Sequence, residues 1–99
     1  MKKYRLDKNI RLKFDKVSEK YYAFCISSGD HFVLTKTGYL ILVLIENGKK
    51  FNEIINFIQQ KEKIDLDICK TDTINFLEKS KKIGILAIDK EDYKNDKKR

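Results

Sequence analysis

Few of the side chains that usually carry chemistry occur in this sequence, and they lie apart. There is one histidine, His31, and there are two cysteines, Cys25 and Cys69. His31 and Cys25 could supply two metal ligands from one hairpin, but two ligands do not make a zinc site, and Cys69 has no obvious place near them. The sequence has no glycine-rich phosphate loop and no Cys-x-x-Cys pair. We therefore expect no metal, no other cofactor and no enzymatic activity.

The net charge of the sequence indicates which kinds of partner the protein could bind. The net charge is +7 over 99 residues, a length that suits one domain. Positive charge favours nucleic acid, an acidic peptide or an acidic protein surface, although a lysine surface that serves only solubility is an equal alternative. No apolar run follows the N-terminus as it would in a signal peptide, and none in the sequence is long enough to span a membrane. We expect a cytoplasmic protein without membrane contact, whose cysteines stay reduced.

Three strands are predicted after a flexible polar arm at residues 1–9. Residues 10–14, Ile-Arg-Leu-Lys-Phe, alternate apolar and charged side chains as a half-buried strand does. Residues 21–26 and 31–34 are rich in aromatic and β-branched residues. Between them, Ser27-Ser28-Gly29 can form a three-residue hairpin loop. This loop predicts Phe24 opposite Phe32, with Cys25 and His31 on the other face of the sheet.

Helical patterns follow the strands. Helices are expected at residues 37–46, 52–60 and 67–82, with Asn52 and Asp67 as the N-caps of the second and third. The first is apolar on every side, so it should be nearly surrounded by protein. Residues 85–88 could form an extra strand or fill the core, and residues 89–99 are expected to be a charged, disordered tail. The order of elements predicts an α+β domain over residues 10–88.

Several short motifs occur in this domain in an order that is typical of one protein family. They are Phe32-Val33-Leu34-Thr35, the apolar run from Ile41 to Ile45, Asn47-Gly48-Lys49-Lys50, Glu53-Ile54-Ile55, Phe76-Leu77 and Gly84-Ile85-Leu86. The set resembles the PqqD-like family, also called RiPP recognition elements, which bind the leader peptides of ribosomally made, modified peptides. The resemblance covers about Ile10 to Ile88. One departure is Ser80, which stands where the family usually has a large apolar residue.

The resemblance implies a winged-helix-like fold in which a three-stranded antiparallel sheet precedes three helices. It also implies that a leader peptide adds to the free edge of the third strand and lies against the third helix. An edge strand does present unpaired N–H and C=O groups that an extended peptide can satisfy. The implied leader-binding residues are Asp30, His31, Phe32, Val33 and Leu34 of the strand, and Lys70, Ile74, Leu77, Glu78 and Lys81 of the helix. Ile74 and Leu77 could equally be core residues, and Lys70 and Lys81 could belong to a solvated face.

The implied function is non-catalytic. The protein would capture the leader of a precursor peptide and present it to a separate maturation enzyme, such as a radical-SAM enzyme or a leader protease, either alone or as part of a larger enzyme. The alternative is a winged-helix DNA-binding protein, but the third helix has no arginine to read base edges, and we expect no nucleic-acid partner. A weaker option is a homodimer that pairs its own edge strands.

Overall fold

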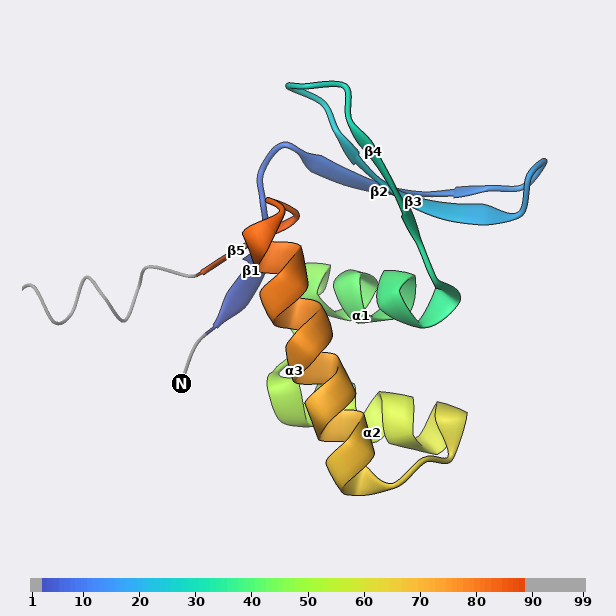
Figure 1. Ribbon diagram of the computed structural model, residues 1–99, viewed down its shortest axis with the longest axis vertical. Helices are drawn as coiled ribbons and strands as arrows, with labels where there is room; N and C mark the ends of the chain where they lie inside the picture. Colours follow the sequence, from blue (N-terminus) through green and yellow to red (C-terminus); the bar gives the residue numbers. More distant parts are fainter. Residues whose placement is uncertain (1–2, 89–99) are drawn as a thin grey trace, which may run out of the picture.

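The computed structural model describes residues 3–88, in which strands are followed by helices (Figure 1). The elements are β1 (Tyr4–Leu6), β2 (Ile10–Asp15), β3 (Lys20–Cys25), β4 (His31–Leu34), α1 (Lys36–Glu46), α2 (Phe51–Glu62), α3 (Leu66–Lys82) and β5 (Leu86–Ile88). Strands β2, β3 and β4 form an antiparallel sheet in that order, so the predicted α+β class is confirmed. The winged-helix comparison holds loosely, because here the sheet precedes the helices.

The register of the β3–β4 hairpin differs from the prediction by one residue. Phe24 pairs with His31, and Ala23 pairs with Phe32. The loop has four residues instead of three, since the Cys25 N–H donates to the Asp30 carbonyl at 2.9 Å and the Gly29 N–H donates to the Cys25 carbonyl at 2.8 Å. A shift of one residue exchanges the two faces of a strand. His31 therefore shares a face with Phe24, and Cys25 lies on the opposite face.

The helices begin slightly earlier than predicted, and residues other than Asn52 and Asp67 cap the second and the third. Helix α1 is capped by Thr35, whose hydroxyl accepts a hydrogen bond from the Gly38 N–H at 3.0 Å. The N-cap of α2 is Lys50 instead of Asn52, and its N–H donates to the Glu53 carboxylate at 2.8 Å. The N-cap of α3 is Asp65 instead of Asp67.

A second, two-stranded sheet joins the two ends of the described chain. Strand β1 pairs antiparallel with β5, with Tyr4 opposite Ile88 and Leu6 opposite Leu86. Residues 4–6 are thus part of the folded domain, and the prediction of a flexible arm over residues 1–9 is wrong there. The strand alternative for residues 85–88 is confirmed from Leu86 onward. Residues 89–99, expected to be a disordered tail, lie outside the described residues.

The core lies between the sheets and the helices, with α1 at its centre. Ile41, Leu42 and Ile45 of α1 are buried, as expected for a helix that is apolar on every side. Ser80 is 3% exposed, so a small hydroxyl side chain fills a core position on α3. Within residues 3–88, no helix is long and apolar enough to cross a membrane.

Candidate functional site

The edge of β4 is the first feature of the candidate site. Among residues 3–88, strand β4 pairs with β3 on one side only. Because the Cys25 N–H bonds to the Asp30 carbonyl, the alternation of an antiparallel pair directs the backbone groups of Phe32 and Leu34 toward β3. The N–H and C=O groups of His31 and Val33 point the other way, to the free edge. Val33 is also 67% exposed.

Aromatic rings lie beside this edge, on the outer face of the sheet. The His31 ring centroid is 4.6 Å from that of Phe24 and 6.2 Å from that of Tyr22. Arg11 and Lys13 of β2 lie across the strands from these rings, and together they line a shallow hollow. The outer face therefore offers aromatic surface and positive charge next to unpaired backbone.

The structure separates the residues that could have formed a metal site. His31 and Cys25 lie on opposite faces of the hairpin, as the observed register requires. Within residues 3–88, no three His, Cys, Asp or Glu side chains gather as metal ligands. Hydrogen bonds from Ser27 and Ser28 lower the pKa of the half-buried Cys25 thiol to about 7. Cys69 is a buried, free thiol on α3.

Helix α3 has two flanks on either side of its buried stripe. The stripe consists of Cys69, Thr73, Leu77 and Ser80. At 100° per residue, Asp72, Phe76, Lys79 and Ile83 follow one side of the stripe, and Lys70, Ile74, Glu78 and Lys81 follow the other. A methyl group placed on Gly38 would lie 2.9 Å from Cε1 of Phe76, so the Phe76 ring packs on the first turn of α1. That turn directly follows β4, so the Phe76 flank is the one that lies toward the C-terminal end of β4.

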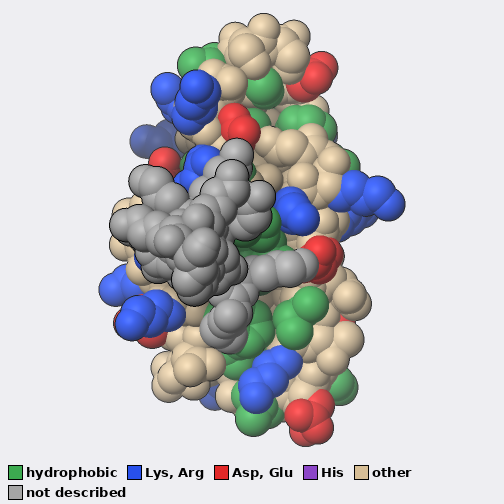
Figure 2. Space-filling model, turned by 90° about the vertical axis from the view of Figure 1, so that its left-hand side faces the viewer, with side chains coloured by type: hydrophobic (Ala, Val, Ile, Leu, Met, Phe, Trp, Pro, Cys, Tyr) green, Lys and Arg blue, Asp and Glu red, His purple; other side chains and the backbone are tan. Residues whose placement is uncertain are grey.

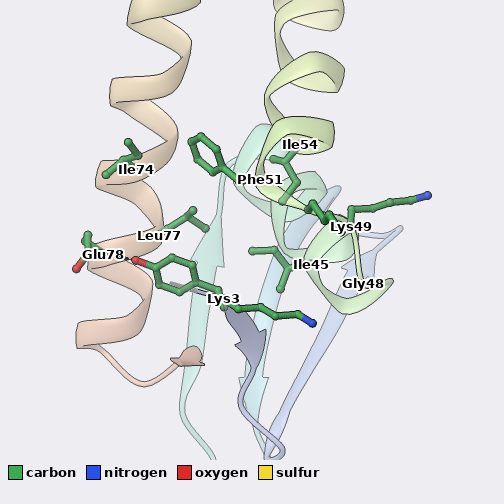
Figure 3. A pocket seen from close by; sticks show the side chains of 11 residues that line it. Lys3, Ile45, Gly48, Lys49, Phe51, Ile54, Ile74, Leu77 and Glu78 are labelled. Atoms are coloured by element: carbon green, nitrogen blue, oxygen red, sulfur yellow. Dashed lines mark hydrogen bonds between the residues drawn. The ribbon is translucent and has the colours of Figure 1, made fainter. Parts of the chain in front are cut away.

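The opposite flank lines a pocket of 510 Å³, which we call the α3 pocket (Figure 3). It is lined by Lys3, Tyr4, Ile45, Gly48, Lys49, Lys50, Phe51, Ile54, Ile74, Leu77 and Glu78. The Tyr4 hydroxyl donates a hydrogen bond to the Glu78 carboxylate, which joins β1 to α3. Burial, this hydrogen bond and the charge of Glu78 raise the pKa of Tyr4 to about 12.

The residues expected from the sequence therefore fall into two groups. His31, Phe32, Val33 and Leu34 form β4 at the edge of the sheet, and Asp30 directly precedes the strand, with its carbonyl bonded to the Cys25 N–H of β3. Ile74, Leu77 and Glu78 line the α3 pocket, which no β4 residue lines. Lys70 and Lys81 are exposed on the same flank of α3, outside the pocket lining. Ile74, Glu78 and the two lysines share the flank of α3 opposite the one that carries Phe76.

Several residues with a place in these surfaces were missed. Phe76 was named in the Phe76-Leu77 motif but not as a site residue, and its contact with Gly38 places it on the flank of α3 next to the start of α1. Tyr4 was assigned to the arm, and its pairing with a strand at the far end of the chain gives no local signal. Figure 2 views the side of β1 and α3, where lysine and arginine side chains alternate with apolar and acidic ones instead of forming one basic patch.

Comparison with known proteins finds matches among solved structures but none among family models or curated sequences. A lasso peptide synthetase B1 complexed with its leader peptide is 16% identical, with a TM-score of 0.76 over 86% of this chain and 98% of that one. TbiB1 in complex with the TbiA(beta) leader peptide is 21% identical, with a TM-score of 0.73 over 83% and 93%.

A third structure carries the family's name. The PqqD part of Methylobacterium extorquens PqqCD, described as a functional and stand-alone RiPP recognition element, is 23% identical. Its TM-score is 0.71 over 85% of this chain and 87% of that one. These three likenesses cover nearly the whole described domain. The chain has the fold of the PqqD-like RiPP recognition elements, as its motifs predicted.

Proposed function

We propose that this protein binds the leader segment of a ribosomally synthesised precursor peptide, in the cytoplasm and without catalysis of its own. It then presents the precursor to a separate maturation enzyme, such as a radical-SAM enzyme or a leader protease. The observation that carries the proposal is the free edge of β4, in a fold whose solved examples include two leader-peptide complexes. Holding the precursor near the enzyme raises its effective concentration there.

The leader binds as an added strand on β4. The N–H and C=O groups of His31 and Val33 supply the main-chain hydrogen bonds, which give affinity without sequence choice. Side chains of an added strand alternate between faces. One set of leader side chains lies beside Tyr22, Phe24 and His31 on the outer face. The other set lies beside Phe32 and Leu34, which pack against the core on the inner face.

Helix α3 contributes through its Phe76 flank. Phe76 is half-buried against the start of α1, so its ring forms an apolar wall on the side of α3 that lies toward the C-terminal end of β4. Lys79 is exposed on the same flank and can pair with a leader carboxylate. Ile74, Leu77 and Glu78 lie on the other flank, so they do not contact a strand added to β4.

A proline at Val33 tests this proposal without removing a bond to β3. Val33→Pro deletes an N–H that points to the free edge, and Val33→Ala removes the same apolar surface but keeps the N–H. The probe is a fluorescently labelled leader from a short precursor encoded beside this protein, followed by anisotropy. We expect roughly tenfold weaker binding for the proline variant and less than about threefold for the alanine variant. Equal affinity of the two folded variants would overturn strand addition at β4.

Two other partners, a second copy of the chain and duplex DNA, are alternatives to the leader peptide. A second copy of the chain could pair with the same edge, in which case dimerisation would vanish in Val33→Pro and added leader would not bind. Duplex DNA has less support, because α3 carries no arginine that could read base edges. Anisotropy with labelled duplex DNA, at the same ionic strength, separates this possibility.

A further inference from the structure

We infer that the α3 pocket is a second binding site, for an acidic segment of a partner protein that inserts one bulky apolar side chain. The inference rests on the proposed function, because the partner is the enzyme to which the leader is presented. The leader occupies the edge of β4 at the same time. Helix α3 would then lie between two ligands, the leader peptide at β4 and the acidic segment of the partner protein in the α3 pocket.

The floor of the pocket is apolar. Ile45 of α1, Ile54 of α2 and Leu77 of α3 are buried, and in Figure 3 their side chains lie beside or below the Phe51 ring. Ile74 forms an apolar wall and is 46% exposed, although it stands on a helix whose other exposed residues are mostly polar. A volume of 510 Å³ lies within the range of about 300–1,000 Å³ that is usual for ligand pockets. An aromatic or large aliphatic side chain is the group such a pocket favours.

The rim of the pocket is basic. Lys3, Lys49 and Lys50 line it, and the Lys3 and Lys49 side chains extend to the same side in Figure 3. Glu78 is the acidic residue of the lining, and its carboxylate already accepts the hydrogen bond of Tyr4. Carboxylates beside the apolar anchor would therefore meet Lys49 and Lys50. Charge complementarity of this kind increases the rate and the selectivity of association.

The position of the pocket favours a partner protein over the leader itself. The pocket uses the flank of α3 that carries Ile74 and Glu78, and the flank that carries Phe76 is the one toward the C-terminal end of β4. A helix with its side chains is about 10 Å wide, so the body of α3 stands between the two ligands. A strand paired with His31 and Val33 runs along β4 and does not line the pocket. Both surfaces can be occupied together.

The test is a titration of the full-length ¹⁵N-labelled protein with a blocked pentapeptide, Glu-Asp-Phe-Asp-Glu, observed through backbone amides. We expect shifts at Gly48, Lys49, Ile74 and Glu78, and none at His31 or Val33. Replacing the phenylalanine by alanine, or the acids by their amides, should reduce the affinity at least fivefold. Shifts of equal size with the alanine peptide would overturn the proposal, because they would show general charge attraction instead of an anchored side chain.

Variants then locate the site. Ile74→Asp should reduce the affinity at least fivefold, and Ile68→Asp, which changes an isoleucine of α3 that is 54% exposed and lies outside the pocket, should not. Lys49→Glu should weaken binding in the same way, and Lys16→Glu in the β2–β3 turn should not. Loss of binding in both members of a pair, or in neither, would contradict the assignment.

A competition titration with the leader peptide separates this inference from the proposed function. Saturating leader peptide should leave the pentapeptide shifts at Ile74 and Glu78 unchanged. Displacement of the pentapeptide would assign the pocket to the leader and overturn the second-site proposal. Leader binding at β4 without any pentapeptide binding would refute the second site and leave the proposed function intact.

Discussion

Tyr4 and Glu78 form a link between the first strand and the third helix. The folded protein holds the Tyr4 proton more tightly than the unfolded chain, since the pKa is raised from 10.0 to about 12. The stability from this group is therefore complete below about pH 10 and is lost as the pH rises toward about 12. We expect Tyr4→Phe to lower the free energy of unfolding by ~1 kcal/mol at neutral pH, by urea denaturation. An alkaline stability loss that is the same in Tyr4→Phe and the wild type would contradict this role.

Gly38 is the residue that lets α3 approach α1. An alanine there would place its Cβ 2.9 Å from Cε1 of Phe76 and 3.2 Å from Oγ1 of Thr35. We expect Gly38→Ala to lower the unfolding free energy by ~1–2 kcal/mol, because the ring must move. With Phe76→Leu in the background, the same change should be neutral or stabilising by up to ~1 kcal/mol, as alanine is the better helix former. A double-mutant cycle by chemical denaturation measures this, and additive effects would show that no clash exists.

At the scale of elements, the loop between β3 and β4 decides which side chains face the ligand. Gly29 has φ at +81°, a conformation that glycine adopts easily. Gly29→Ala should therefore cost ~1 kcal/mol in thermal or urea unfolding. Gly29→Asn is the matched control and should cost less, since asparagine tolerates this region. Equal costs for alanine and asparagine would indicate that the loop does not keep its four-residue form.

The sequence contains enough local information for the kinds and order of most elements, but not for their pairing. Alternation in residues 10–14 and the apolar run around Leu42 were read correctly because they are local patterns. The register of β3 and β4 depends on whether the loop has three or four residues, and Ser27-Ser28-Gly29 fits either. Strand β1 has three residues and pairs with β5 from the other end of the chain, so no local pattern reveals it.

In the candidate site, the edge strand could be predicted from the sequence, but the flank of α3 beside it could not, because that flank depends on tertiary packing. Exposure at the edge of β4 follows from the strand order, so Asp30 to Leu34 could be named in advance. The flank of α3 that lies toward this strand depends on how the helix is rotated against α1. The sequence shows apolar residues at Ile74 and at Phe76, and only the contact with Gly38 decides between them.

At the scale of the whole molecule, the net charge of +7 should act on every acidic ligand. Leader binding should weaken by about threefold to tenfold between about 50 and 500 mM NaCl, since salt screens exposed lysines. It should not be abolished, because backbone pairing at β4 does not depend on charge. Anisotropy at several salt concentrations measures the slope. A slope as steep as that of a DNA-binding protein would instead favour phosphate contacts.

The central claim is that the leader pairs with the free edge of β4, and amide hydrogen exchange tests it most directly. In the free protein, the N–H groups of His31 and Val33 point to solvent, and those of Phe32 and Leu34 point to β3. With saturating leader peptide, the amides of His31 and Val33 should exchange roughly tenfold more slowly or more, and those of Phe32 and Leu34 should change less. Leader binding that leaves the exchange of His31 and Val33 unchanged would contradict strand addition at this edge.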